Sequence, residues 1–315
     1  MTRSTSWRPA TRRARPFRSA IRPERGRKCE PGQVGSIASC AMADLQAQIE
    51  ELWARRESLS PDDGDAVRIV HEAITLLDTG QARVAEVGAD GEVTVHQWLK
   101  LAILLLFRLS KMETIELGPY EYADKIPLKR NYQANGVRVV PGASARWGSF
   151  LDRGVVMMPS YVNIGAHVGA NTMVDTWATV GSCAQIGANT HLSGGVGIGG
   201  VLEPPQAQPV IIGDDCLIGS RCVVADGARV GDGVVLGAGC VLTGSIPVID
   251  AETGEELSRG VVPSWSVAIS ATRPRTFAGG EFGLPCVLVI KRLEPGERHD
   301  KGKLNDVLRD HGAAT

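Results

Sequence analysis

Aromatic residues and long apolar runs are scarce in this chain. Phe, Trp and Tyr together make up 5% of its 315 residues. The most apolar stretch, Leu99 to Leu109, contains Lys100 and Arg108 and is too short to cross a bilayer. We therefore expect no membrane span and a core built from aliphatic side chains.

Cysteine patterns typical of disulfide frameworks and metal sites are also missing. The seven cysteines form no C-x-x-C pair and no Cys/His metal spacing. Within the repeat described below, the only histidines are His167 and His191, which lie 24 positions apart. The sequence therefore predicts a reduced, cytoplasmic compartment and no bound metal.

Acidic residues are rare at the start of the chain. Residues 1–41 hold nine Arg and one Lys against only Glu24 and Glu30. A transit peptide or a nucleic-acid-binding arm would have such a composition. We favour a disordered extension or an upstream start codon, because a helical pattern begins abruptly at Met42, and we expect no nucleic-acid partner.

Glycine is abundant, with 37 residues, and much of it follows an apolar repeat of period six. A period of six fits neither an α-helix nor a simple strand, but it suits a chain that turns a corner after each short strand. The repeat occupies these positions: Val156, Val162, Val168, Val174, Val180, Ile186, Leu192 and Ile198, then Ile212, Ile218, Val224, Val230, Leu236 and Leu242.

Small residues stand two positions before most of these apolar ones, Cys216, Cys222 and Cys240 among them. Large and small inward side chains would then alternate, and three sides per turn would give a triangular coil of about 18 residues. The period by itself predicts a β-solenoid. We expect the glycines after the apolar positions to form its corners by adopting positive φ.

The rest of the chain forms distinct regions before and after the repeat. Amphipathic patterns predict an α-rich domain over 42–111, with a hairpin near Asp90, followed by a connector over 112–138. The solenoid is expected over 139–242 and a capping segment over 243–315, with a hairpin, a strand over 286–291 and a helix over 303–309. Between Ile198 and Ile212, fourteen residues replace the twelve of two regular steps, so a loop is expected there.

One corner departs from the glycine rule. Counting in steps of eighteen, Met157, Asp175 and Ser193 follow the apolar residue on the same side of the coil. An acid beside the inward Val174 is costly unless it has partners or a function. From spacing alone, a structural aspartate that hydrogen-bonds the turn backbone is the favoured interpretation.

The sequence around Asp175 resembles the tetrahydrodipicolinate N-succinyltransferases. The matching segments are MPSYVNIGA from Met158, MVDTWATVGSCAQIG from Met173 and HLSGGVGIGGVLEP from His191. Shorter matches are RVAE, HQWLK and RVVP upstream, and ETGE and VLVIK downstream, so the resemblance covers roughly residues 42–311.

This resemblance implies a left-handed parallel β-helix and a homotrimer with active sites between neighbouring chains. It implies transfer of a succinyl group from succinyl-CoA, a co-substrate, to the amine of tetrahydrodipicolinate in lysine and diaminopimelate biosynthesis, with no tightly bound cofactor. Asp175 would be the catalytic and substrate-binding carboxylate, and Arg138 would bind the substrate. A guanidinium can hold a carboxylate bidentately, and a carboxylate can accept the proton of the attacking amine.

A second catalytic acid proposed for some relatives would fall at Val223, which has no carboxylate. Glu203 in the loop or Asp226 could replace it, or the proton could pass to water. His191 precedes an inward residue and is expected to point outward, so a surface or interface role is favoured over a catalytic one. No residue is assigned to coenzyme A.

Two other functions stay open. The same acceptor could receive an acetyl group from acetyl-CoA, because the spacing of residues does not select the acyl group. A trimeric β-helix could also serve as a scaffold without catalysis, in which case replacing Asp175 would have no functional effect.

Overall fold

The computed structural model describes residues 34–88, 90–295 and 308–312. The chain divides into two units, residues 1–40 and residues 41–315. In the first unit only the beginning of α1 (Val34–Ala54) is described, so most of the predicted basic extension lies outside the described residues. The second unit contains everything that follows.

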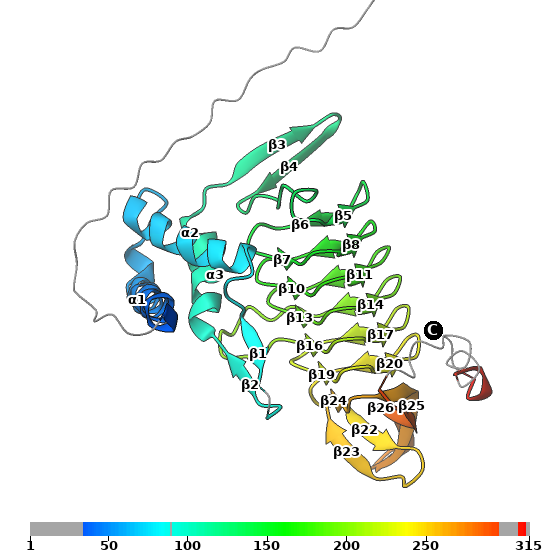
Figure 1. The fold of residues 1–315 in the computed structure, drawn as a ribbon. Helices are drawn as coiled ribbons and strands as arrows, with labels where there is room; N and C mark the ends of the chain where they lie inside the picture. Colours follow the sequence, from blue (N-terminus) through cyan, green and yellow to red (C-terminus); the bar gives the residue numbers. More distant parts are fainter. Residues whose placement is uncertain (1–33, 89, 296–307, 313–315) are drawn as a thin grey trace, which may run out of the picture. The chain divides into compact units, whose positions relative to one another are not determined.

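Among the described residues, three α-helices and two hairpins precede the solenoid (Figure 1). After α1 come the 3-10 helix η1 (Arg56–Ser58), α2 (Gly64–Asp78), the strands β1 (Ala85–Val87) and β2 (Val93–Val95), and α3 (Gln97–Leu109). Asp63 caps α2 by accepting a hydrogen bond from the Ala66 backbone N–H at 3.1 Å. None of the described helices is both long and apolar enough to cross a membrane.

The repeat forms a triangular parallel β-helix whose strands stack into three sheets (Figure 1). Sheet I contains β7 (Phe150–Leu151), β10 (His167–Val168), β13 (Gln185–Ile186), β16 (Ile211–Ile212), β19 (Arg229–Val230) and β24 (Val261–Val262). Sheet II contains β5 (Arg138–Val139), β8 (Val156–Met157), β11 (Met173–Val174), β14 (His191–Leu192), β17 (Leu217–Ile218) and β20 (Val235–Leu236). Sheet III contains β6 (Ser144–Ala145), β9 (Tyr161–Val162), β12 (Thr179–Val180), β15 (Gly197–Ile198), β18 (Val223–Val224) and β21 (Val241–Leu242).

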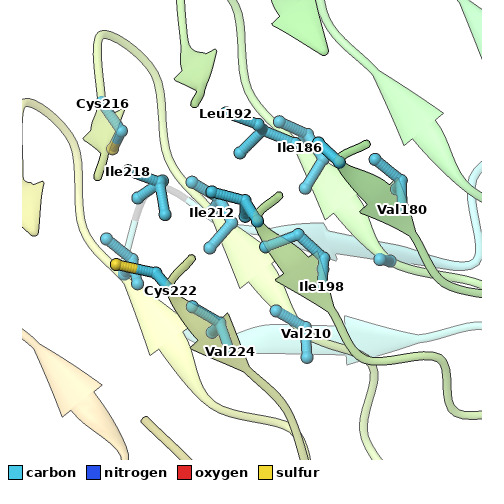
Figure 2. Packing of buried hydrophobic residues seen from close by; sticks show 14 of the residues in the cluster. Val180, Ile186, Leu192, Ile198, Val210, Ile212, Cys216, Ile218, Cys222 and Val224 are labelled. Carbon is cyan, nitrogen blue, oxygen red and sulfur yellow. The ribbon is translucent and has the colours of Figure 1, made fainter. Parts of the chain in front are cut away.

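The interior of the solenoid is filled by aliphatic residues and cysteine thiols (Figure 2). Ile186, Leu192, Cys216 and Cys222 are all fully buried, as the alternation of large and small inward residues predicts. Each large aliphatic side chain that is fully buried contributes roughly 1.5–3 kcal/mol relative to exposure. The coils therefore stabilise one another through their shared interior.

The sixfold count is wrong by one residue at the first coil. Strand β11 pairs with β8 so that Val174 lies opposite Met157, and Met173 lies opposite Val156. Met157 is fully buried, whereas Val156 is only partly buried, so the step from Met157 to Val162 has five residues. Met157 therefore does not share a column with Asp175, contrary to the prediction.

The glycines after the inward residues are required for a different reason from the one predicted. Gly169 and its equivalents do not have positive φ, which is found instead two residues later at positions such as Asn171 (58°) and Asn189 (53°). A Cβ at Gly169 would lie 2.6 Å from the Ala188 nitrogen of the next coil. Glycine is needed there because two backbones approach closely.

The interruption in the repeat is also larger than counted. Ile186 pairs with Ile212, and the chain passes from β15 in sheet III directly to β16 in sheet I. The fourteen residues from Ile198 to Ile212 therefore replace a single step of six. The loop is held by Lys100, a fully buried residue of α3, whose Nζ donates to the Ala207 carbonyl at 2.7 Å.

The structure contains two hairpins that the sequence analysis missed or underestimated. The predicted connector holds β3 (Glu113–Leu117) and β4 (Tyr120–Asp124). At the other end, the predicted hairpin is β22 (Pro247–Asp250) with β23 (Glu256–Arg259), but the predicted short strand is part of a long hairpin of β25 (Ser266–Phe277) and β26 (Gly280–Arg292) that extends sheet II. The helix predicted over 303–309 falls mainly outside the described residues.

Candidate active site

Asp175 lies at the corner where the chain leaves sheet II for sheet III. It directly follows the inward Val174, and its Oδ1 accepts a hydrogen bond from the Thr176 backbone N–H at 2.6 Å. Its side chain is 30% exposed, so the second carboxylate oxygen remains accessible. The turn contact expected of a structural aspartate is present, but it uses only one of the two oxygens.

The second oxygen of Asp175 faces a histidine from the next coil. His191 Nε2 lies 3.2 Å from Asp175 Oδ2, and both side chains are about one-third exposed. Partial burial opposes ionisation of Asp175, but the hydrogen bonds from Thr176 and His191 outweigh it and lower the pKa of the carboxyl. Asp175 is therefore ionised at neutral pH.

Arg138 lies on the same sheet, toward the N-terminal end of the solenoid. Its strand β5 pairs with β8, which pairs with β11, so Arg138, Val156 and Met173 occupy successive positions in one column. Two strand spacings of about 4.8 Å separate Arg138 from Met173. The Arg138 side chain is exposed and has no ion-pair partner among the described residues. The sheet thus places a free guanidinium and an ionised carboxylate on one side of the solenoid.

Glu203 is not brought next to Asp175 within the chain. Its loop leaves the solenoid where sheet III passes to sheet I, and Glu203 lines a hollow with Trp53, Leu104 and Arg108 of the helical region. Its role in the site stays a prediction. Val223, the position of the missing second acid, lies on β18 of sheet III with 42% exposure.

The sequence analysis placed His191 outside the site because its side chain was expected to point away from the core. The side chain does point outward, but Asp175 occupies the same outer surface. Asp175 and His191 are sixteen residues apart in the sequence, two fewer than the eighteen of a full coil. This spacing puts His191 on the next strand of sheet II, opposite Met173, and it could have predicted the contact. Two polar residues with that spacing at one corner can meet diagonally.

The geometry suits an acyl transfer to an amine. The ionised carboxylate can hold an amine N–H, and an imidazole hydrogen-bonded to it keeps the carboxylate oriented and charged. The guanidinium of Arg138 can hold a carboxylate of the same acceptor. Among the described residues, no other Asp–His contact is found on the outer surface of sheet II.

Comparison with known proteins shows to which class of protein the chain belongs. Residues 44–109 match the family model described as tetrahydrodipicolinate N-succinyltransferase N-terminal, and residues 209–244 match the hexapeptide repeat of succinyl-transferase. The solenoid is therefore the left-handed β-helix of the hexapeptide-repeat transferases, and the chain is an acyltransferase.

Close relatives identify the family within that class. A 2,3,4,5-tetrahydropyridine-2,6-dicarboxylate N-succinyltransferase of Chelativorans sp. is 47% identical over 85% of this chain and 98% of its own length. Those of Methylorubrum extorquens and Paramagnetospirillum magneticum are 48% and 47% identical, over 85% and 86% of this chain and 99% and 100% of their own lengths. The chain belongs to the tetrahydropyridine-dicarboxylate N-succinyltransferase family.

Proposed function

We propose that the protein transfers the succinyl group of succinyl-CoA to the amine of tetrahydrodipicolinate in its ring-opened form, 2-amino-6-oxopimelate. This is a step of lysine and diaminopimelate biosynthesis. The observation that carries the proposal is near-full-length identity of 47–48% to relatives named for this activity. The pair of Asp175 and His191 on sheet II supplies the chemistry that the reaction needs.

In the proposed mechanism Asp175 is the catalytic residue. Its carboxylate accepts a hydrogen bond from the amine, whose nitrogen attacks the carbonyl carbon of the thioester. The carbon–nitrogen bond forms, the carbon–sulfur bond breaks and CoA leaves as the thiolate. The proton released by the amine passes to Asp175 and from there to solvent. Arg138 binds a carboxylate of the acceptor, and His191 keeps the Asp175 carboxylate ionised and oriented.

The missing acid at Val223 is consistent with this assignment, because the mechanism uses one carboxylate and returns the proton to solvent. Glu203 and Asp226 have no assigned step. Succinyl-CoA is a co-substrate that leaves after each turnover, and no tightly bound cofactor takes part.

We further propose that the enzyme works as a cytoplasmic homotrimer with sites between neighbouring chains. Large apolar side chains are exposed beside Asp175 and on sheet III: Trp177 is 73% exposed, Val223 42% and Val241 44%. A second copy of the chain would cover this surface. Light scattering on the purified protein should give three times the mass of the chain, and a monomeric mass would contradict the proposal.

The proposed activity is tested by steady-state rates with two thioesters. With 2-amino-6-oxopimelate as acceptor, we expect kcat/KM for succinyl-CoA to exceed that for acetyl-CoA by at least 100-fold. A preference for acetyl-CoA would favour the acetyl-transfer alternative. Absence of turnover with both donors would favour the scaffold.

A further inference from the structure

A groove separate from Asp175 lies on the outer face of sheet I, against the segment that leads into the β1–β2 hairpin. It has a volume of about 370 Å³, and its lining includes Arg83, His167 and Gln185 together with the acids Asp214 and Asp232. Pockets that hold small molecules have volumes of roughly 300–1,000 Å³. We call this one the hairpin groove.

Arg83 supplies a positively charged group to the hairpin groove. Its Nε donates to Gln185 Oε1 at 3.1 Å, and Gln185 is fixed in turn because its Nε2 donates to the Cys183 carbonyl at 2.9 Å. Partial burial lowers the pKa of the Arg83 guanidinium, against the opposing influence of Glu86 and Asp214. Arg83 makes no ion pair among the described residues, so its terminal N–H groups can donate to a ligand.

His167 adds no charge to the same wall. It lies beside Gln185, because β10 pairs with β13, and burial, with a smaller effect from Arg83, lowers its pKa to about 3. The ring is therefore neutral at neutral pH, and Arg83 is the only cation in the described lining. His167 Nδ1 is buried without a hydrogen-bond partner among the described residues, so this wall has unused hydrogen-bonding capacity.

Two carboxylates at the corner where sheet I ends form the other side of the groove. Asp214 Oδ1 accepts the Ala188 N–H at 2.7 Å, and Asp232 Oδ1 accepts the Asp214 N–H at 2.8 Å. Both side chains are exposed, and neither is in an ion pair within the part of the chain that the structure describes. They follow the neighbouring strands β16 and β19, about 4.8 Å apart, so their charges repel each other. A bound ammonium group would offset this repulsion.

The charges of the hairpin groove define the chemistry of a matching ligand. Arg83 stands against two carboxylates, and the remaining acid, Asp152, lies three strand spacings from Asp214, about 14 Å away. A guanidinium binds a carboxylate through two parallel hydrogen bonds, and an ammonium group donates up to three. A ligand with one carboxylate and two ammonium groups would therefore balance Arg83, Asp214 and Asp232.

We propose that the hairpin groove binds a free diamino acid of the charge type of L-lysine, with Arg83 holding its carboxylate and Asp214 and Asp232 holding its ammonium groups. Asp214 is near enough to act on the charge of Arg83 but does not form an ion pair with it, so a small molecule can bridge the two. The proposal goes beyond the proposed function and does not depend on it, because Asp175 belongs to the corner of sheet II.

The first experiment titrates the full chain with L-lysine and two analogues by calorimetry. L-Lysine should bind at millimolar concentration or below. Cadaverine, which lacks the carboxylate, and L-norleucine, which lacks the side-chain ammonium group, should each bind about tenfold more weakly, because each loses one charge-assisted contact. Absence of L-lysine binding would overturn the proposal. Equal binding of cadaverine would indicate a polyamine site, and equal binding of L-norleucine a general amino-acid site, and either would make the assignment wrong.

Substitutions then locate the binding. Arg83→Gln, and Asp214→Asn combined with Asp232→Asn, should each weaken L-lysine binding about tenfold. Asparagine keeps the Oδ1 that accepts the backbone N–H at both corners, and unchanged melting temperatures would show that the variants fold. Arg68→Gln and Asp65→Asn, from an exposed pair on α2, are the charge-matched controls and should bind as wild type does. Wild-type affinity in both groove variants would place the ligand elsewhere and overturn the proposal.

The analogue and substitution data together assign each end of the ligand. Arg83→Gln should weaken L-lysine binding but leave cadaverine binding unchanged, because cadaverine has no carboxylate for Arg83 to hold. An equal loss for both ligands would mean that Arg83 acts on the shape of the groove, and its assigned contact would be wrong. Failure of the proposed function would instead appear as absent turnover in wild type, which this titration does not measure.

Discussion

Two corners of the same solenoid are built for different purposes. In four successive coils glycine follows the inward residue where sheet I ends, at Gly169, Gly187, Gly213 and Gly231, and Asp152 stands at the equivalent position of the coil before them. Where sheet II ends, the equivalent residues are Asp175 and Ser193, and glycine returns only at Gly219 and Gly237. Across these four coils the sheet I corner is uniform, whereas the sheet II corner carries a side chain in two of them.

Where glycine is present, the two corners are equally tight. A Cβ on Gly169 at the sheet I corner would lie 2.6 Å from Ala188 N, and a Cβ on Gly219 at the sheet II corner would lie 2.6 Å from Ala238 N. Asp175 and Ser193 therefore mark the two coils in which the sheet II corner accommodates a side chain, and this is where the candidate catalytic residue lies.

The largest expected effect is on catalysis at the sheet II corner. Asp175→Asn removes the charge that holds the amine and accepts its proton, so kcat/KM should fall at least 100-fold. Asp152→Asn is the matched control, because Asp152 Oδ1 accepts the Arg153 N–H at 2.6 Å at the sheet I corner in the same way. We expect the control to keep near-wild-type activity. Wild-type turnover in purified Asp175→Asn would show that Asp175 is a structural corner residue.

The next effect is on stability at the sheet I corner. Gly169→Ala forces a methyl group against the backbone of the next coil and should lower the free energy of unfolding by about 1–3 kcal/mol. Gly194→Ala, at the sheet II corner but one residue later in the turn, where a Cβ would have Thr176 O as its nearest neighbour at 3.6 Å, should change it by less than about 0.5 kcal/mol. Urea denaturation of both variants measures the difference. Equal effects would mean that close approach of the backbones does not explain the glycine at position 169.

The comparison between sheet I and sheet II extends to one histidine on each sheet, His167 and His191. His167 on sheet I is buried, and desolvation, with a smaller effect from Arg83, lowers its pKa to about 3. Between pH 6.5 and about 3 the unfolded chain binds a proton that the folded chain does not, so stability falls as pH falls. His167→Phe should remove about 2 kcal/mol of the loss in unfolding free energy between pH 7 and pH 5.

Denaturation curves at pH 7 and pH 5 test this prediction. His96→Gln is a suitable control, since the His96 side chain is 35% exposed and lies 3.7 Å from Glu86 in the β1–β2 region. If wild type and His167→Phe lost the same stability on acidification, His167 would be protonated in the folded chain.

The smallest effect concerns His191 on sheet II. His191→Phe removes the hydrogen bond that helps to lower the pKa of Asp175, so the acid limb of the kcat/KM profile should move to higher pH and kcat/KM should fall about tenfold. His191→Gln can still donate to Asp175 and should restore the position of the limb. An acid limb that stays in place in His191→Phe would show that His191 does not act through Asp175.

Much of the solenoid could be predicted because its pattern is local. The six-residue period of the short strands predicts which residues point inward. It predicts the large inward residues Val174 and Leu192 and the small inward residues Cys216 and Cys222, and all four are buried. The five-residue step at Met157 could not be found in this way, because Val156 and Met157 are both apolar. Only pairing with β11 decides which of them points inward.

The candidate site divides in the same manner. Asp175 stands out in the sequence because it is an acid directly after an inward residue, a position that glycine occupies in most other coils. Its contact with His191 depends on how one coil lies on the next. That contact does not follow from a six-residue period.

The sequence by itself determined the coiled architecture, the alternation of its interior and the corner where a carboxylate replaces glycine. These features depend on the spacing of neighbouring residues along the chain. The tertiary structure alone decided the register between coils, the length of the inserted loop, the partner of Asp175 and the pairing of Arg259 and Arg273 with Glu256. Those depend on hydrogen bonding and packing between strands that are remote in the sequence, and the period of the repeat says nothing about them.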